Sequence, residues 1–126
     1  MSPFVVNGDL WRVIRVGAGD PRLVDRTGRE RLATTDPSRM TVWLRSDLMP
    51  PILDKVLLHE VAHAVTISWG LLRPLGAMVE SGHRVGVEEW SAQLMENHAI
   101  EAVNAASTVL GRPVCVMGEC LGTPHD

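Results

Sequence analysis

The feature that most constrains the fold of this chain is the stretch from Ile52 to about Trp69, where apolar residues recur at helical spacing. Pro50-Pro51 stands just before it, where the first turn of a helix tolerates proline, and Gly70 follows it, where helices commonly end. We therefore predict a helix over residues 52–69. Although this is the most apolar part of the chain, its polar side chains exclude a plain membrane span: Asp54, Lys55, His59, Glu60 and His63.

Within the predicted helix, His59-Glu60-Val61-Ala62-His63 forms an HExxH motif. Histidines four positions apart lie on one face of a helix, so both imidazoles can reach one metal ion. Zn²⁺ accepts nitrogen ligands at about 2.0–2.1 Å in tetrahedral geometry. Glu60 follows the first histidine, which places its carboxylate beside the metal, where it can take a proton from a water and deliver it to a leaving amine. The motif predicts a zinc site with His59 and His63 as ligands and Glu60 as the catalytic acid–base.

A simpler interpretation of the motif needs no metal. The two histidines would then be core residues that are hydrogen-bonded to their neighbours, and Glu60 would lie on the surface. The residues around the motif are mostly apolar, however, so three polar groups would be costly to bury without a partner. A metal ion supplies this partner, and the predicted helix is the structural context that the motif requires. The sequence therefore favours a zinc site over two hydrogen-bonded core histidines.

A catalytic zinc needs a third protein ligand and one open position. A second helix is predicted from about Val87 to Leu110, where Gly111-Arg112-Pro113 ends it. On this helix Glu88 lies at the centre of an apolar stripe, whereas Glu89 lies among polar residues, so we predict Glu88 as the third ligand. An acid in the first turn of a helix can also simply interact with the helix dipole. The alternatives that stay open are Glu89, Glu80, His83 and His98.

Two segments before the helix are typical of β-strands. Leu10–Val16 is rich in β-branched and apolar residues, and Met40–Leu44 follows a turn at Asp36-Pro37-Ser38. Arg22–Asp25 is a candidate third strand. With 126 residues the chain is long enough to bury one core. We predict a single α+β domain over residues 1–126, in which a small N-terminal sheet packs against two helices with zinc between them. Its core is expected over about 4–110, and residues 111–126 are expected to form a loose tail.

Charge and cysteine content narrow the possible functions. The chain has 12 Lys and Arg against 15 Asp and Glu, and its net charge of −3 argues against a nucleic-acid partner. Its first residues lack a basic segment followed by an apolar one, so no signal peptide is predicted. The two cysteines, Cys115 and Cys120, are too few for a disulfide framework, so we expect free thiols and a cytoplasmic protein. We expect no membrane partner. A disulfide or a second metal site at these cysteines is an alternative.

The order of these segments resembles the small gluzincins, zinc peptidases whose third ligand is a downstream glutamate. Over about residues 36–103, the strand Met40–Leu44, the HExxH helix and Val87-Glu88-Glu89 at a helix start look like the ImmA/IrrE-type and related phage metallopeptidases. The resemblance implies one Zn²⁺ per chain and hydrolysis of a polypeptide substrate. In such proteins the strand before the active-site helix is the sheet edge that pairs with an extended substrate. That role would fall on Thr41, Val42, Trp43 and Leu44.

Other polar and aromatic residues have less specific roles. Zinc peptidases stabilise the oxyanion of a tetrahedral intermediate, and this chain has no Tyr that could do so. His83 and Arg84 precede the second helix in a long loop, and they are candidates for this role or for a substrate contact; the alternative is an exposed polar loop. His98 is predicted to be a packed, hydrogen-bonded histidine. The tryptophans expected to fill the core are Trp43, Trp69 and Trp90.

Two other functions stay open at this point. The first is a non-catalytic interaction module stabilised by zinc, because a chain of 126 residues leaves little length for a deep substrate cleft. The second is a zinc hydrolase of an amide or ester that is not a polypeptide. A groove that is open at both ends would favour peptides, whereas a closed pocket would favour a small molecule.

Overall fold

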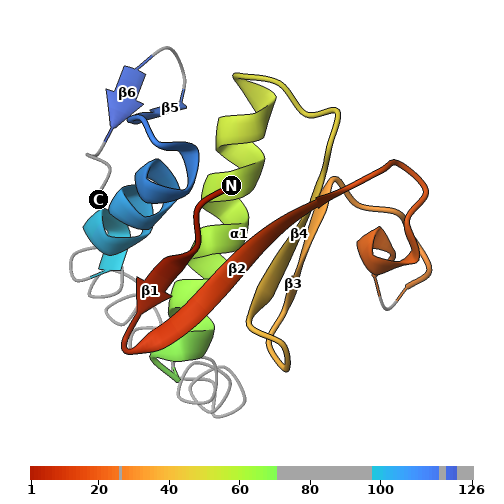
Figure 1. Cartoon of the computed structure of the whole chain (residues 1–126), viewed down its shortest axis with the longest axis horizontal. Coiled ribbons are helices and arrows are strands. Elements are labelled where there is room, and N and C mark those ends of the chain that lie inside the picture. Colours follow the sequence, from red (N-terminus) through yellow and green to blue (C-terminus); the bar gives the residue numbers. More distant parts are fainter. Residues whose placement is uncertain (26, 71–97, 117–118, 122–126) are drawn as a thin grey trace, which may run out of the picture.

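The computed structural model of the chain describes residues 1–25, 27–70, 98–116 and 119–121. They form a small α+β fold, in which a four-stranded mixed sheet covers one side of a long helix (Figure 1). A second helix, described over 98–110, lies beside the first one, close to the N-terminal strand. The elements are β1 (Phe4–Val6), β2 (Asp9–Val16), the 3₁₀ helix η1 (Pro21–Leu23), β3 (Ala33–Asp36), β4 (Thr41–Arg45), α1 (Ile52–Ser68), β5 (Val114–Val116) and β6 (Glu119–Leu121).

The sheet has the strand order β1-β2-β4-β3. β1 and β2 form an antiparallel hairpin, whose turn Asn7-Gly8 has positive φ angles of 48° and 80°. Asn-Gly is the residue pair that a two-residue hairpin turn of this kind favours. β2 and β4 are parallel, and β3 pairs antiparallel with the other side of β4. β5 and β6 form a separate two-stranded hairpin.

The core lies between the sheet and the two helices. The inward face of α1 supplies Leu57, Val61 and Ala64, which are fully buried against strand residues such as Trp11 and Val42. The indole N–H of Trp11 donates to the Ser68 hydroxyl at 2.7 Å, which ties β2 to the last turn of α1. The helix over 98–110 closes the core with small and β-branched side chains: Ala102, Ala105, Ala106 and Val109.

The structure confirms the predicted helix and the two main predicted strands as α1, β2 and β4. The described part of the predicted second helix, 98–110, is also helical, whereas 87–97 lies outside the described residues. The predicted strand Arg22–Asp25 is wrong, because Pro21 opens a 3₁₀ turn in which the Arg22 N–H donates to the capping carboxylate of Asp20. β1 and β3 were not predicted, since strands of three and four residues give too short a pattern.

The prediction that Thr41–Leu44 forms the sheet edge is wrong. β4 lies between β2 and β3, and Thr41, Val42 and Leu44 are buried. A strand that is buried on both faces has a continuous apolar pattern, which is typical of an interior strand. The edge of the sheet that lies next to the HExxH motif is β3.

The described part of the predicted C-terminal tail is anchored to α1. Arg112 makes a bidentate ion pair with the buried Asp54, at 2.7 Å for both nitrogens, and the Cys115 N–H donates to the same carboxylate at 2.7 Å. The Arg112 guanidinium holds the pKa of Asp54 below its ordinary value. Cys115 is disulfide-bonded, and Cys120 is its Cα partner across the β5–β6 hairpin. Cys115 is therefore not the free thiol that we expected, and the part of the predicted tail around Arg112 and Cys115 is held against α1.

Among the described residues, no helix has both the length and the apolar character that a membrane crossing requires.

Candidate metal centre

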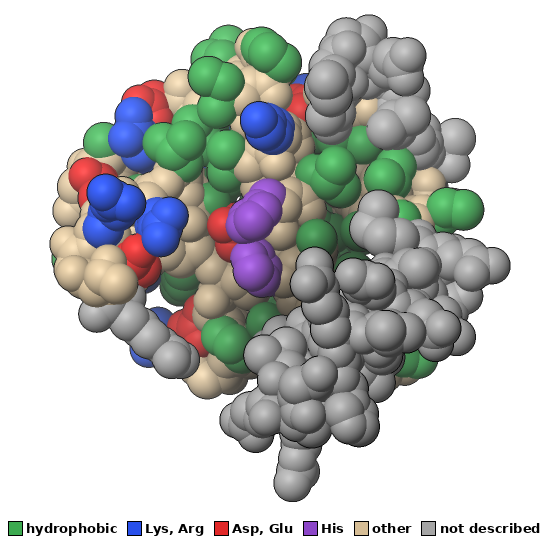
Figure 2. Space-filling model, turned by 180° about the vertical axis from the view of Figure 1, so that it is seen from behind, with side chains coloured by type: hydrophobic (Ala, Val, Ile, Leu, Met, Phe, Trp, Pro, Cys, Tyr) green, Lys and Arg blue, Asp and Glu red, His purple; other side chains and the backbone are tan. Residues whose placement is uncertain are grey.

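Two histidines lie side by side on the exposed face of α1. The Nε2 atoms of His59 and His63 are 3.1 Å apart, and their rings meet edge to face with centroids 4.7 Å apart. Figure 2, in which histidines are purple, shows such a pair at the surface of this face of the molecule. The arrangement follows from the spacing of the two residues, since positions i and i+4 lie one above the other on a helix.

The positions of these two nitrogens fit one shared zinc ion. Two ligands at about 2.0–2.1 Å from a tetrahedral zinc would lie about 3.3–3.4 Å from each other. The observed 3.1 Å is close to this separation, and both rings present the same nitrogen, Nε2. A hydrogen bond between the two rings has a similar length and also directs both Nε2 atoms to one place.

The described residues supply these two candidate ligands and no third one. Among them, no group of three His, Cys, Asp or Glu side chains is placed to hold a metal. The predicted third ligand Glu88 and the alternatives Glu80, His83 and Glu89 lie outside the described residues, as do Arg84 and Trp90. His98 lies elsewhere: its Nδ1 is 3.3 Å from the Glu101 carboxylate, and its ring contacts Trp69. This confirms the prediction that His98 is packed and hydrogen-bonded.

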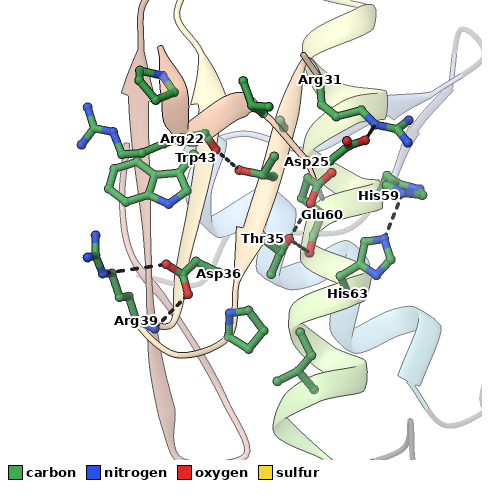
Figure 3. A pocket seen from close by; sticks show the side chains of 16 residues that line it. Arg22, Asp25, Arg31, Thr35, Asp36, Arg39, Trp43, His59, Glu60 and His63 are labelled. Carbon is green, nitrogen blue, oxygen red and sulfur yellow. Dashed lines mark hydrogen bonds and ion pairs between the residues drawn. The ribbon is translucent and has the colours of Figure 1, made fainter. Parts of the chain in front are cut away.

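Glu60 is buried between α1 and the sheet edge. Its Oε2 atom accepts a hydrogen bond of 2.5 Å from the Thr35 hydroxyl on β3 (Figure 3). A buried carboxylate needs such a donor, and Thr35 supplies it from the strand that packs on this part of α1. The alternative of a surface Glu60 does not hold, because only 8% of this residue is exposed.

One cavity connects the histidines, Glu60 and the sheet edge. It has a volume of about 610 Å³ and extends on both sides of β3, and we call it the β3 cavity. His59, Glu60 and His63 line it from α1, and Trp43 lines it from β4. Its other lining residues come from residues 21–39 and from Ile67: Pro21, Arg22, Val24, Asp25, Arg31, Ala33, Thr34, Thr35, Asp36, Pro37 and Arg39.

The predicted substrate-binding residues divide into two groups. Trp43 lies in the wall of the β3 cavity, whereas Thr41, Val42 and Leu44 are buried and do not line it. Trp43 is almost fully buried, in a small cluster with Val16 and Leu23, as the prediction of a core tryptophan requires. The same prediction is wrong for Trp69, which is 42% exposed at the end of α1.

The sequence patterns did not identify several residues of the β3 cavity. Thr35 had no signal of its own, because it lies in a short polar strand far from the motif. Arg31 and Asp25 form an ion pair of 2.6 Å beside the motif, and hydrogen bonds from the Thr27 hydroxyl and from Arg31 hold the pKa of Asp25 well below its ordinary value. The charge alternation in residues 20–31 was the one available hint.

Comparison of the chain with family models, with curated proteins and with solved structures found no match.

Proposed function

We propose that this protein is a zinc-dependent hydrolase of peptide bonds, similar in its site to the gluzincin peptidases. One observation carries the proposal. The Nε2 atoms of two exposed histidines converge to 3.1 Å in the same cavity as a buried glutamate, beside β3, the edge strand of the sheet within the described part of the chain. A metal ion explains why two imidazoles converge, and the sheet edge explains how a polypeptide could lie beside them.

In the proposed reaction His59, His63 and Glu88 would hold the zinc. When bound, the metal would polarise the scissile carbonyl and lower the pKa of a bound water toward 7. Glu60 accepts a proton from this water and passes it to the leaving amine. Thr35 donates to one oxygen of the Glu60 carboxylate, which limits the rotation of the side chain while the proton is transferred.

An extended substrate would pair with β3 in place of the strand expected from the sequence. The hydrogen bond from the Arg45 N–H to the Leu32 carbonyl sets the phase of the β3–β4 ladder. Because pairs alternate in an antiparallel ladder, the backbone groups of Ala33 and Thr35 then point away from β4. They are available to a peptide strand that lies in the β3 cavity, next to the histidines.

The first test is metal analysis of the purified protein. We expect one zinc per chain in the wild type and loss of zinc under mild chelation after His63→Ala, because a single imidazole remains from α1. His98→Ala is the matched control, since His98 is bonded to Glu101, and this variant should keep its zinc. A wild type without metal, or equal retention by both variants, would contradict the proposed site.

The same measurement assigns the third ligand. Glu88→Ala should lose zinc, together with the rise in melting temperature that zinc produces, whereas Glu89→Ala should keep both. The opposite result would make Glu89 the ligand.

The second test concerns the position of Glu60. Thr35→Val removes the hydroxyl but keeps the shape of the side chain, and valine suits a strand. We expect kcat to fall about 10–150-fold, with KM and zinc content unchanged, since a hydrogen bond to a charged group contributes about 1.5–3 kcal/mol. Thr35→Ser should restore the rate. Thr34→Val is the control, because the Thr34 hydroxyl donates to the Arg22 carbonyl instead. An unchanged kcat in Thr35→Val would show that this contact has no role in proton transfer.

A further inference from the structure

We propose that the β3 cavity selects polypeptide segments with acidic side chains, which its three arginines bind. This inference shares one assumption with the proposed function, namely that the ligand is a polypeptide. It adds which kind of polypeptide the cavity binds. The arginines are Arg22, Arg31 and Arg39.

Each of these arginines is the exposed partner of an ion pair. Side-chain exposures are 47% for Arg22 against 19% for Asp20, and 55% for Arg31 against 20% for Asp25. They are 70% for Arg39 against 28% for Asp36. The carboxylates are thus turned toward the protein, and the guanidinium groups are turned outward.

An ion pair outside the cavity has the opposite arrangement. In the Arg45–Asp47 pair the arginine is 29% exposed and the aspartate is 57% exposed. The outward arginine is therefore not general to the ion pairs of this chain, although Arg112, which pairs with the buried Asp54 outside the cavity, shares it with 38% exposure. Because Asp20, Asp25, Asp36 and Glu60 outnumber the three arginines by one in formal charge, it is the orientation of the pairs that decides what a ligand meets.

The guanidinium groups keep donors for a ligand. Arg31 binds Asp25 through Nε, and Arg22 binds Asp20 through Nε and Nη2. A guanidinium has five N–H donors, so within the described residues both side chains have further N–H groups that these pairs do not use. A carboxylate is the ligand that matches such a planar set of donors.

Two of the arginines, Arg31 and Arg22, are also held in place before a ligand arrives. Asp25 accepts from the Thr27 hydroxyl at 2.6 Å and from the N–H groups of Thr27 and Arg29, which fixes the carboxylate that holds Arg31. The Arg22 guanidinium lies over the Trp43 ring, 4.4 Å from its centroid. A positioned donor loses less conformational entropy when it binds than a free side chain does.

The cations lie on both sides of the strand that would receive the ligand. In Figure 3, Arg31 and Asp25 lie on the side of β3 that carries His59, whereas Arg22 and Arg39 lie on the other side with Trp43. Successive side chains of an extended peptide point to opposite faces. A segment with acidic residues at adjacent positions would therefore meet arginines on both sides. A sheet edge also pairs with a peptide backbone, which a nucleic acid lacks.

The test measures binding rather than hydrolysis. The full chain with Glu60→Gln is titrated, by fluorescence anisotropy, against a short fluorescein-labelled peptide that alternates pairs of Glu and Ala. A peptide of equal length with Gln in place of Glu is the comparison. We expect the Glu peptide to bind about 10-fold more tightly, and this difference should shrink with added salt.

Arginine variants then locate the interaction. A triple variant should remove the preference for the Glu peptide over the Gln peptide; it combines Arg22→Gln, Arg31→Gln and Arg39→Gln. The single variant Arg45→Gln should keep this preference. Equal binding of both peptides, or a preference that survives the triple variant, would overturn the inference. Competition by a single-stranded oligonucleotide would also overturn it, because the arginines would then bind phosphate.

The two proposals fail in different ways. A wild type that binds the Glu peptide but holds no zinc and cleaves nothing would remove the proposed hydrolase and leave this inference standing. A wild type that holds zinc and cleaves labelled casein, but whose Glu60→Gln variant does not distinguish the peptides, would remove this inference alone.

Discussion

Replacing Glu60 by glutamine is expected to abolish peptide hydrolysis and to leave zinc binding intact. The amide keeps the size of the side chain and can still accept the hydrogen bond from Thr35, but it cannot take a proton from water. Loss of a general acid–base typically lowers the rate by about 10²–10⁴-fold. The measurement is the initial rate of cleavage of labelled casein, with zinc content determined on the same preparation.

Glu101→Gln is the matched control for this result. Glu101 is also hydrogen-bonded, to the Trp69 indole and to His98, but it lies outside the β3 cavity. It should retain the wild-type rate. A Glu60→Gln variant that cleaves as fast as the wild type would refute the mechanism. A wild type that binds zinc but cleaves nothing would favour the interaction module over the enzyme.

The second large effect is expected on stability. Asp54→Ala should lower the free energy of unfolding by about 2–4 kcal/mol, because Arg112 and the Cys115 N–H lose their common acceptor. Asp54 is fully buried, so its replacement also leaves a space between α1 and the β5–β6 hairpin. The measurement is the urea midpoint of the oxidised protein.

Asp47→Ala is the control for this effect, since the exposed Arg45–Asp47 pair should contribute no more than about 0.5 kcal/mol. The Asp54 contribution also depends on pH. Because Arg112 lowers the pKa of Asp54 below its ordinary value of 3.8, the stabilisation is fully present above that value and is lost as the pH falls through the lowered pKa. Equal midpoints for Asp54→Ala and the wild type would contradict the anchoring role.

The elements that could be predicted from the sequence are those with local signals. α1 has a long apolar pattern between Pro51 and Gly70, and its two histidines lie one turn apart wherever the helix packs. The strands β2 and β4 are rich in apolar and β-branched residues. Their order in the sheet could not be predicted, because pairing depends on contacts between distant residues. An interior strand was therefore taken for the edge.

The residues of the candidate site also differ in whether a local sequence pattern marks them. His59, Glu60 and His63 belong to one motif and could be named from it. Thr35 reaches Glu60 only because β3 packs on α1, across 25 positions of sequence. Arg31 enters the β3 cavity through a turn that Asp25 organises, and no periodic pattern marks that turn. Glu88 was inferred from helix phase alone, and it stays a prediction.

Within the residues that the structure describes, β3 is an edge strand, and this position affects how the protein behaves in solution. A strand edge that accepts a foreign peptide can also accept the same strand of a second copy, which is the first step of edge-to-edge aggregation. Here β3 is only four residues long, and the outward arginines Arg31 and Arg39 flank it. Two copies that met at this edge would bring the outward guanidinium groups of both copies together. The arginines proposed to select a ligand would therefore also oppose the association of two copies at β3. This electrostatic repulsion weakens as added salt shortens the screening length.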